Sequence, residues 1–142
     1  IITKKEIKKC LEKTNPYFLN AVIIRTLPNS ETKKRRNYMK ENSCFFSIEA
    51  ISYLVSLGVQ HLLVDIPSVD RLFDDGHLIA HNIFWETEKK KLNPKSINKT
   101  ITEMIYVADS INDGQYFLNL QIPPFVSDAA PSRPILYSIN EL

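Results

Sequence analysis

The sequence predicts an α/β fold, and three segments in the first half of the chain carry this prediction. Residues 21–25 and 61–65 (Ala-Val-Ile-Ile-Arg and His-Leu-Leu-Val-Asp) are short, mostly apolar runs, which is typical of strands buried on both faces of a sheet. Between them, residues 47–58 carry apolar side chains at helical spacing. A strand, a helix and a second strand in this order predict a βαβ unit with parallel strands.

The two helices expected in this half begin at recognisable residues. Residues 3–6 (Thr-Lys-Lys-Glu) have the form of a capping box, so a first helix is expected to begin there and to end before Pro16. Ser47 is the expected N-cap of the second helix, and Gly58 is expected to end it. The residues from 26 to 42 are polar and charged, which predicts a loop.

The second half of the chain is expected to be mostly β-structure. Pro67 is expected to turn the chain, and residues 76–84 are compatible with a short helix. The lysine-rich stretch 86–98 predicts an insertion at the surface. The segments that predict extended structure are residues 100–107, 116–120 and 134–137.

Length and composition place the chain among ordinary globular proteins. At 142 residues it predicts a single domain, residues 1–142, able to bury its own core. No apolar run approaches the roughly 18 residues of a membrane span, and no signal-peptide pattern is visible. Cys10 and Cys44 have no C-x-x-C spacing, so we expect two reduced, partly buried thiols. A cytoplasmic protein with no membrane partner is therefore expected.

The charge is unevenly distributed along the chain. Lysine and arginine total 18 and aspartate and glutamate 16, for a net charge of +2, and the basic excess lies in residues 1–41. The run Lys33–Arg36 could form a nucleic-acid patch, but no stacking aromatic residues are interleaved with it. A solvated loop is the favoured interpretation, and no nucleic-acid partner is expected. A basic nucleic-acid-binding domain formed by residues 1–41 remains the less favoured alternative.

Two histidines are the first candidates for chemistry. His77 and His81 are four residues apart, so on a helix they would share one face, as metal-binding histidines often do. The residue after His77 is Leu78, which differs from the glutamate of an H-E-x-x-H protease. The spacing alone is a weak indication of a metal site.

Three glutamates are candidate partners for these histidines, because divalent cations accept mixed sets of imidazole and carboxylate ligands. They are Glu86, Glu88 and Glu103. Glu103 stands out because it lies in an apolar stretch, and burying a carboxylate costs several kcal/mol unless it is paired or bound to a metal.

The segment that follows the second predicted strand is rich in polar groups. Asp65 and Asp70 could act as acid or base, or could cap turns together with Ser68. Asp128 and Arg133, much later in the chain, are interpreted as a structural ion pair. A serine hydrolase or a phosphate-binding loop is unsupported, because there is no G-x-S-x-G motif and the chain holds only three glycines.

Taken together, these motifs resemble the cyclase family of metal-dependent hydrolases, which includes kynurenine formamidase (arylformamidase). Residues 80–82 (Ala-His-Asn) look like the family's Ala-His-His, and residues 102–104 (Thr-Glu-Met) look like its Glu-Asn-Leu. The other segments that carry the resemblance are residues 22–26, 47–58, 64–70 and 128–133.

The resemblance implies a swivelling β/β/α domain and a hydrolase that acts on an amide or formamide. By residue matching, His81 and Glu103 would bind a divalent metal ion, zinc or manganese, with His77 as a reserve ligand. Asp65, Ser68 and Asp70 would shape the loop and orient these ligands without binding the metal themselves. The resemblance also implies a small-molecule amide substrate and a homo-oligomer.

Three features depart from the family pattern. The gap between His81 and Glu103 is longer than in the family, which the lysine-rich stretch 87–99 explains as an insertion. Position 82 is Asn where the family has a second histidine, and the family signature H-x-G-T-H-x-D is absent. Because the chain begins Ile-Ile, we expect it to be the C-terminal portion of a longer hydrolase, with the N-terminal part of the domain and the general acid/base histidine upstream of Ile1. A non-catalytic relative that acts as a structural or binding module remains an alternative.

Overall fold

The computed structural model describes residues 1–87 and 91–139. Contacts between residues divide the chain into two compact units, Ile1–Asp109 and Ser110–Leu142. Each unit is described by itself below, and the single domain expected over residues 1–142 stays a prediction.

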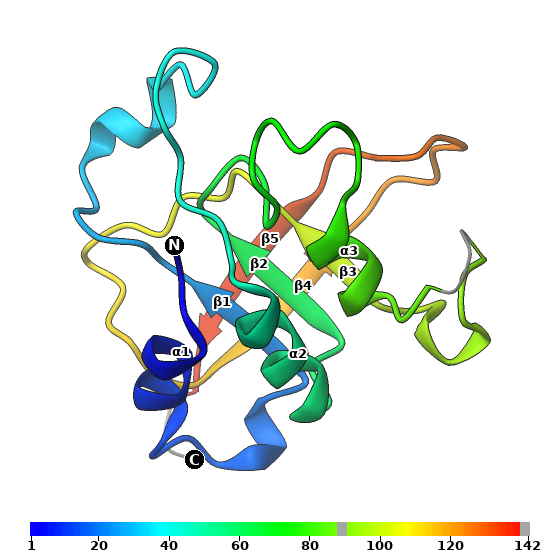
Figure 1. Cartoon of the computed structure of the whole chain (residues 1–142). Helices are drawn as coiled ribbons and strands as arrows, with labels where there is room; N and C mark the ends of the chain where they lie inside the picture. Colours follow the sequence, from blue (N-terminus) through cyan, green and yellow to red (C-terminus); the bar gives the residue numbers. More distant parts are fainter. Residues whose placement is uncertain (88–90, 140–142) are drawn as a thin grey trace. The chain divides into compact units, whose positions relative to one another are not determined.

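The first unit is built on a three-stranded parallel sheet (Figure 1). Its strands are β1 (Ala21–Ile24), β2 (His61–Val64) and β3 (Thr100–Thr102), in the order β1-β2-β3. In the register, Leu63 of β2 pairs with Ile23 on one side and with Thr102 on the other. The predicted βαβ unit is therefore confirmed, and the fold is α/β. The third strand is shorter than the extended segment expected over residues 100–107.

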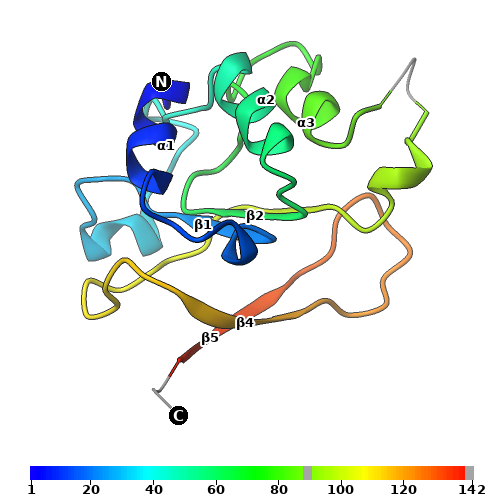
Figure 2. The ribbon, with the colours of Figure 1, turned by 90° about the horizontal axis from the view of Figure 1, so that it is seen from below.

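Three α-helices lie on one face of this sheet, as Figure 2 shows. They are α1 (Lys4–Leu11), α2 (Ile48–Ser56) and α3 (Ile79–Phe84). The core between helices and sheet contains Ile51, Leu54, Leu62 and Phe84, all with no exposed surface. Burying a side chain of this size stabilises the fold by about 1.5–3 kcal/mol, so this core fixes α2 and α3 against β2.

The helix ends expected from the sequence are confirmed. Thr3 and Glu6 form the capping box of α1, in which each side chain bonds the backbone N–H of the other residue. Ser47 Oγ accepts from the N–H of Ala50 at the start of α2. Gly58 follows α2 with φ +80°, a conformation that glycine adopts without the cost a side chain would impose.

Two stretches expected to be loops contain short 3₁₀ helices. Glu31–Arg35 forms one of them within residues 26–42, and Pro94–Ser96 forms another within residues 86–98. Ser96 is buried, at 1% exposure, and its hydroxyl donates to Glu86. Ser96 is therefore a buried residue within the stretch predicted as a surface insertion, and residues 88–90 of that stretch lie outside the described part. A further 3₁₀ helix is Pro16–Phe18.

The second unit is an antiparallel hairpin. Its strands β4 (Tyr116–Gln121) and β5 (Arg133–Ser138) pair with Phe117 opposite Tyr137 and Leu118 opposite Leu136. Both predicted extended segments of this region are thus confirmed. The ion pair expected between Asp128 and Arg133 does not form within the described residues. Asp128 Oδ1 accepts a hydrogen bond from the hydroxyl of the neighbouring Ser127.

Cys10 and Cys44 are unpaired, as expected, but both are exposed. The prediction that they are partly buried is therefore wrong. Within the described residues, no helix combines the length and the apolar character that crossing a membrane requires.

Candidate functional site

The candidate site forms where β2 and β3 end. Because the strands are parallel, their carboxyl ends lie at the same edge of the sheet, and ligands in α/β folds bind at this edge. Residues 65–70 leave β2 there and Glu103 follows β3. The two segments are tied by backbone hydrogen bonds from Met104 N–H to Ile66 O (3.0 Å) and from Ile105 N–H to Val64 O (3.2 Å).

The Glu103 side chain is anchored to the loop after β2. The backbone N–H of Val69 donates to Glu103 Oε1 at 2.9 Å. Val69 is itself held from the other side, where its carbonyl accepts from the N–H of Phe46 at 2.9 Å. Glu103 thus has a fixed position relative to the core, although 26% of its side chain is exposed.

The Asp70 carboxylate caps helix α3 from outside the helix. The N-cap position is occupied by Leu78, which lies in the left-handed region at φ 47° and offers no capping side chain. Asp70 accepts hydrogen bonds from the N–H groups of Ala80 (2.6 Å) and His81 (3.2 Å), which would otherwise lack partners. A negative charge at a helix N-terminus is also stabilising.

The same carboxylate orients the ring of His81. Asp70 Oδ2 lies 2.7 Å from His81 Nδ1. An ionised carboxylate only accepts hydrogen bonds, so Nδ1 carries the proton and donates it. In the neutral ring, the lone pair then lies on Nε2. A histidine whose second nitrogen bonds a carboxylate is the usual arrangement around metal-binding histidines.

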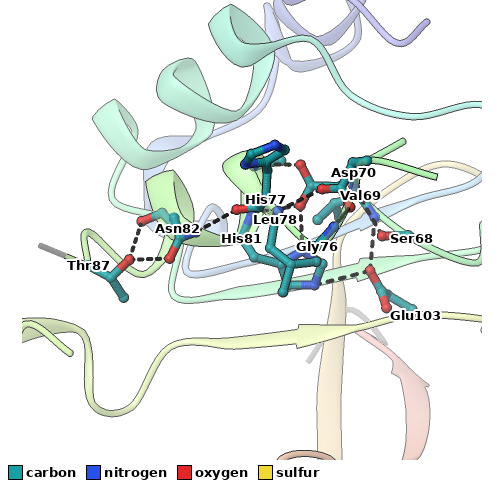
Figure 3. A network of polar contacts seen from close by, with 12 residues as sticks. Ser68, Val69, Asp70, Gly76, His77, Leu78, His81, Asn82, Thr87 and Glu103 are labelled. Atoms are coloured by element: carbon teal, nitrogen blue, oxygen red, sulfur yellow. Dashed lines mark hydrogen bonds and ion pairs between the residues drawn. The ribbon is translucent and has the colours of Figure 1, made fainter. Parts of the chain in front are cut away.

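The free nitrogen of His81 faces Glu103. His81 Nε2 and Glu103 Oε1 are 3.5 Å apart, and Figure 3 shows the chain of contacts from Asp70 through His81 to Glu103. A neutral imidazole and an ionised carboxylate both present lone pairs here, so the pair requires a proton or a cation to bridge it. Two ligands bound at ~2.1 Å to a tetrahedral zinc ion lie about 3.4 Å apart, close to the observed separation.

Burial is the main influence on the titration of Glu103. It raises the pKa of Glu103, and the nearby Asp70 carboxylate adds to the rise. The N–H of Val69, the charge of His81 and the hydroxyl of Ser68 oppose it. The charged form of Glu103 is therefore costly unless a positive charge lies beside it.

His81 and Glu103 are suitable ligands for a divalent metal ion, but two protein ligands do not make a complete metal site. Structural zinc sites use four protein ligands and catalytic ones use three. In the part of the chain that the structure describes, no three His, Cys, Asp or Glu side chains are grouped as a metal site would require. At least one further ligand would have to come from outside the described residues.

A comparison with models of protein families finds a match in the first half of the chain. The family model described as "Putative cyclase" matches residues 1–71, half of the chain. The chain belongs to the cyclase family. No curated protein matches the sequence. The matched residues of this cyclase-family chain include β1, α2, β2 and Asp70, and they end before His81 and Glu103.

Of the other two candidate carboxylates, Glu86 does not join His81. Glu86 Oε2 accepts from Lys99 Nζ at 2.6 Å and from the hydroxyl of Ser96 at 3.0 Å, which holds the pKa of Glu86 below its usual value. Glu88 lies outside the described residues.

His77 and Asn82 lie apart from the contact between His81 and Glu103. Helix α3 begins only at Ile79, so His77 precedes it, and the expectation that His77 and His81 share one helical face is wrong. His77 is exposed, and its carbonyl accepts from Asn82 Nδ2 at 3.0 Å. Asn82 Oδ1 also accepts from the hydroxyl of Thr87, on the side of the network away from Glu103 (Figure 3). Asn82 therefore ties two loops together.

Asp65 belongs to a different cluster from the one predicted. Its carboxylate accepts from the N–H and the hydroxyl of Thr26, each at 2.9 Å, and from Lys33 Nζ at 2.7 Å. The side chains of Asp65 and Lys33 are 0% and 7% exposed. The structure thus does not bring Asp65 to His81, because Thr26 and Lys33, both in the segment that follows β1, hold its carboxylate instead. Its role is to anchor that loop to the sheet.

Ser68 lies beside the candidate ligands, as predicted. Its hydroxyl oxygen accepts from the N–H of Asp70 at 3.1 Å and so shapes the turn that presents this aspartate. It also contributes to the environment of Glu103.

One neighbour of the site was not predicted. The ring of Trp85 lies against the ring of His81, with centroids 5.3 Å apart. The signal was present in the sequence, since Trp85 follows His81 by four residues and positions i and i+4 of a helix are neighbours.

Proposed function

We propose that this chain contributes His81 and Glu103 to the divalent-metal site of a cyclase-family hydrolase that cleaves a non-peptide C–N bond. The observation that carries the proposal is the ordered contact from Asp70 to His81 to Glu103, in which Nε2 is free and faces a carboxylate. The proposed substrate is a small-molecule amide, and the proposed activity is similar to that of an arylformamidase.

The ion would be zinc or manganese. When bound, it would lower the pKa of a water molecule and polarise the amide carbonyl. His81 would bind through Nε2, and Glu103 through its carboxylate. Asp70 would keep the Nδ1 proton of His81 in place and so keep Nε2 available. The group that transfers protons during hydrolysis, a histidine by family resemblance, would lie outside the described residues.

The contacts of the basic run Lys33–Arg36 support the proposal that this protein has no nucleic-acid partner. Lys33 is buried against Asp65, Lys34 pairs with Glu31 at 3.1 Å, and Arg36 pairs with Glu41 at 3.0 Å. Three of the four charges are thus engaged within the protein. We also propose a cytoplasmic homo-oligomer with no membrane partner.

The test uses the full-length protein that contains this chain. We expect one tightly held divalent ion per site, and release of formate from N-formylkynurenine that a chelator abolishes and added metal restores. His81→Ala and Glu103→Gln are expected to abolish both properties, whereas His77→Ala serves as the matched control and is expected to keep them. Metal binding without formate release from this or related amides would instead favour a non-catalytic relative.

A further inference from the structure

The indole of Trp85 lies against the imidazole of His81 at an interplanar angle of 52°. Trp85 is half-buried and is the only tryptophan of the chain. It does not belong to any of the motifs on which the proposed metal site rests. Its contact with His81 therefore calls for a separate explanation.

Trp85 is itself fixed at two points. Its backbone N–H donates to the carbonyl of His81 at 3.0 Å, which ends α3, and its indole Nε1–H donates to the carbonyl of Lys99 at 3.2 Å. Lys99 is in turn held to the end of the same helix, because its Nζ donates to the carbonyl of Phe84 at 3.0 Å. The indole is thus a rigid surface with little freedom to turn.

Two independent contacts consequently restrict the ring of His81. Asp70 holds one edge through Nδ1, and Trp85 packs against the ring from the same helix. A hydrogen bond to one nitrogen still leaves the ring some freedom to rotate about that bond. A neighbouring ring that is itself held by a hydrogen bond removes much of this freedom, because packed side chains allow few alternative rotamers.

We propose that Trp85 is a positioning residue that keeps His81 Nε2 directed at Glu103, so that the two side chains are arranged for an ion before it binds. This inference rests on the proposed function in one respect: the effect of Trp85 on metal affinity requires that His81 and Glu103 bind a metal ion. Its structural part, the fixed orientation of the ring, can be measured without any metal. Supporting residues around metal ligands change affinity by about 10- to 100-fold when mutated, although they never touch the ion.

The experiment compares Trp85→Leu, Trp85→Phe and a matched control, Tyr53→Leu. Tyr53 is also a half-buried aromatic residue that packs against the core, but it lies on α2. In the metal-free protein, nuclear magnetic resonance follows the Nδ1 proton of His81 and the tautomer of its ring. Zinc affinity of the full-length protein is measured by calorimetry.

In wild type and Tyr53→Leu we expect a single Nδ1-protonated tautomer with a slowly exchanging proton. In Trp85→Leu we expect a faster-exchanging proton, a mixture of tautomers and zinc affinity lower by about 10-fold. Trp85→Phe keeps an aromatic ring and is expected to recover most of the wild-type behaviour, which also provides a folded variant if Trp85→Leu is unstable. Wild-type exchange, tautomer and affinity in both Trp85 variants would overturn the proposal. If wild type itself binds no zinc, the proposed function fails, and the exchange and tautomer measurements still decide the role of Trp85.

Discussion

Asp70 Oδ2 lies 2.7 Å from His81 Nδ1, and the carboxylate of Asp70 also caps the helix that carries His81. One side chain therefore fixes both the position of the helix and the orientation of the imidazole. These two roles of Asp70 explain how a six-residue helix whose N-cap is a leucine in the left-handed region can present His81 in one orientation.

Asp70→Asn is expected to weaken metal binding more than it weakens the fold. The amide oxygen of asparagine can replace only one of the two carboxylate oxygens that cap α3, so we expect a loss of about 1 kcal/mol in the free energy of unfolding. The amide no longer holds the Nδ1 proton as a carboxylate does, so zinc affinity is expected to fall about 10- to 100-fold. Denaturant unfolding and calorimetry measure the two effects. If Asp70→Asn loses stability but keeps wild-type zinc affinity, Asp70 does not orient His81 for metal binding.

Glu103→Gln is expected to change how stability depends on pH in the metal-free protein. Burial raises the pKa of Glu103 in the folded state above its unfolded value. The stabilising contribution of the protonated form is therefore complete below the unfolded pKa and is lost as the pH rises through the folded pKa. Glutamine cannot ionise, so the variant should avoid this loss and be at least as stable as wild type at neutral pH. Unfolding curves between pH 4 and pH 8 measure the difference, and a variant clearly less stable at neutral pH would show the expectation to be wrong.

Lys33→Ala is expected to destabilise the fold strongly, because it leaves the buried carboxylate of Asp65 without its charged partner. Breaking a buried ion pair from one side costs about 3–5 kcal/mol. Arg35→Ala is the matched control, since Arg35 lies in the same 3₁₀ helix but is exposed, and its effect should stay within about 0.5 kcal/mol. Equal effects of the two substitutions in denaturant unfolding would refute the anchoring role of Lys33.

The parts of the fold that could be predicted are those that local sequence determines. Ser47 and Gly58 mark the ends of α2 by residue type alone, and the apolar runs around β1 and β2 have no alternative to burial. The helix predicted within residues 76–84 begins earlier than α3 does, because Leu78 gives no capping signal. Its cap is Asp70, eight residues earlier, and a contact across that separation has no local pattern.

The candidate site could be predicted only in part for the same reason. Asp65 and Asp70 follow the same strand, and their residue type does not distinguish them. Their roles differ because Lys33 reaches Asp65 from a loop 32 residues earlier, whereas the start of α3 folds back onto Asp70. Residue type and spacing make His81, Glu103, Ser68 and Asp70 candidates, and the resemblance supplies the role expected of each. The structure brings these four residues together.

The most direct test is a titration of the full-length protein with Co²⁺, in which the fluorescence of Trp85 reports binding of the ion. A bound Co²⁺ ion at His81 would lie beside the indole, so we predict saturable quenching that is lost in His81→Ala and in Glu103→Gln and kept in His77→Ala. Any further tryptophan outside this chain would be replaced by phenylalanine in all four proteins. Quenching with unchanged affinity in both His81→Ala and Glu103→Gln would contradict the assignment of His81 and Glu103 as the ligands.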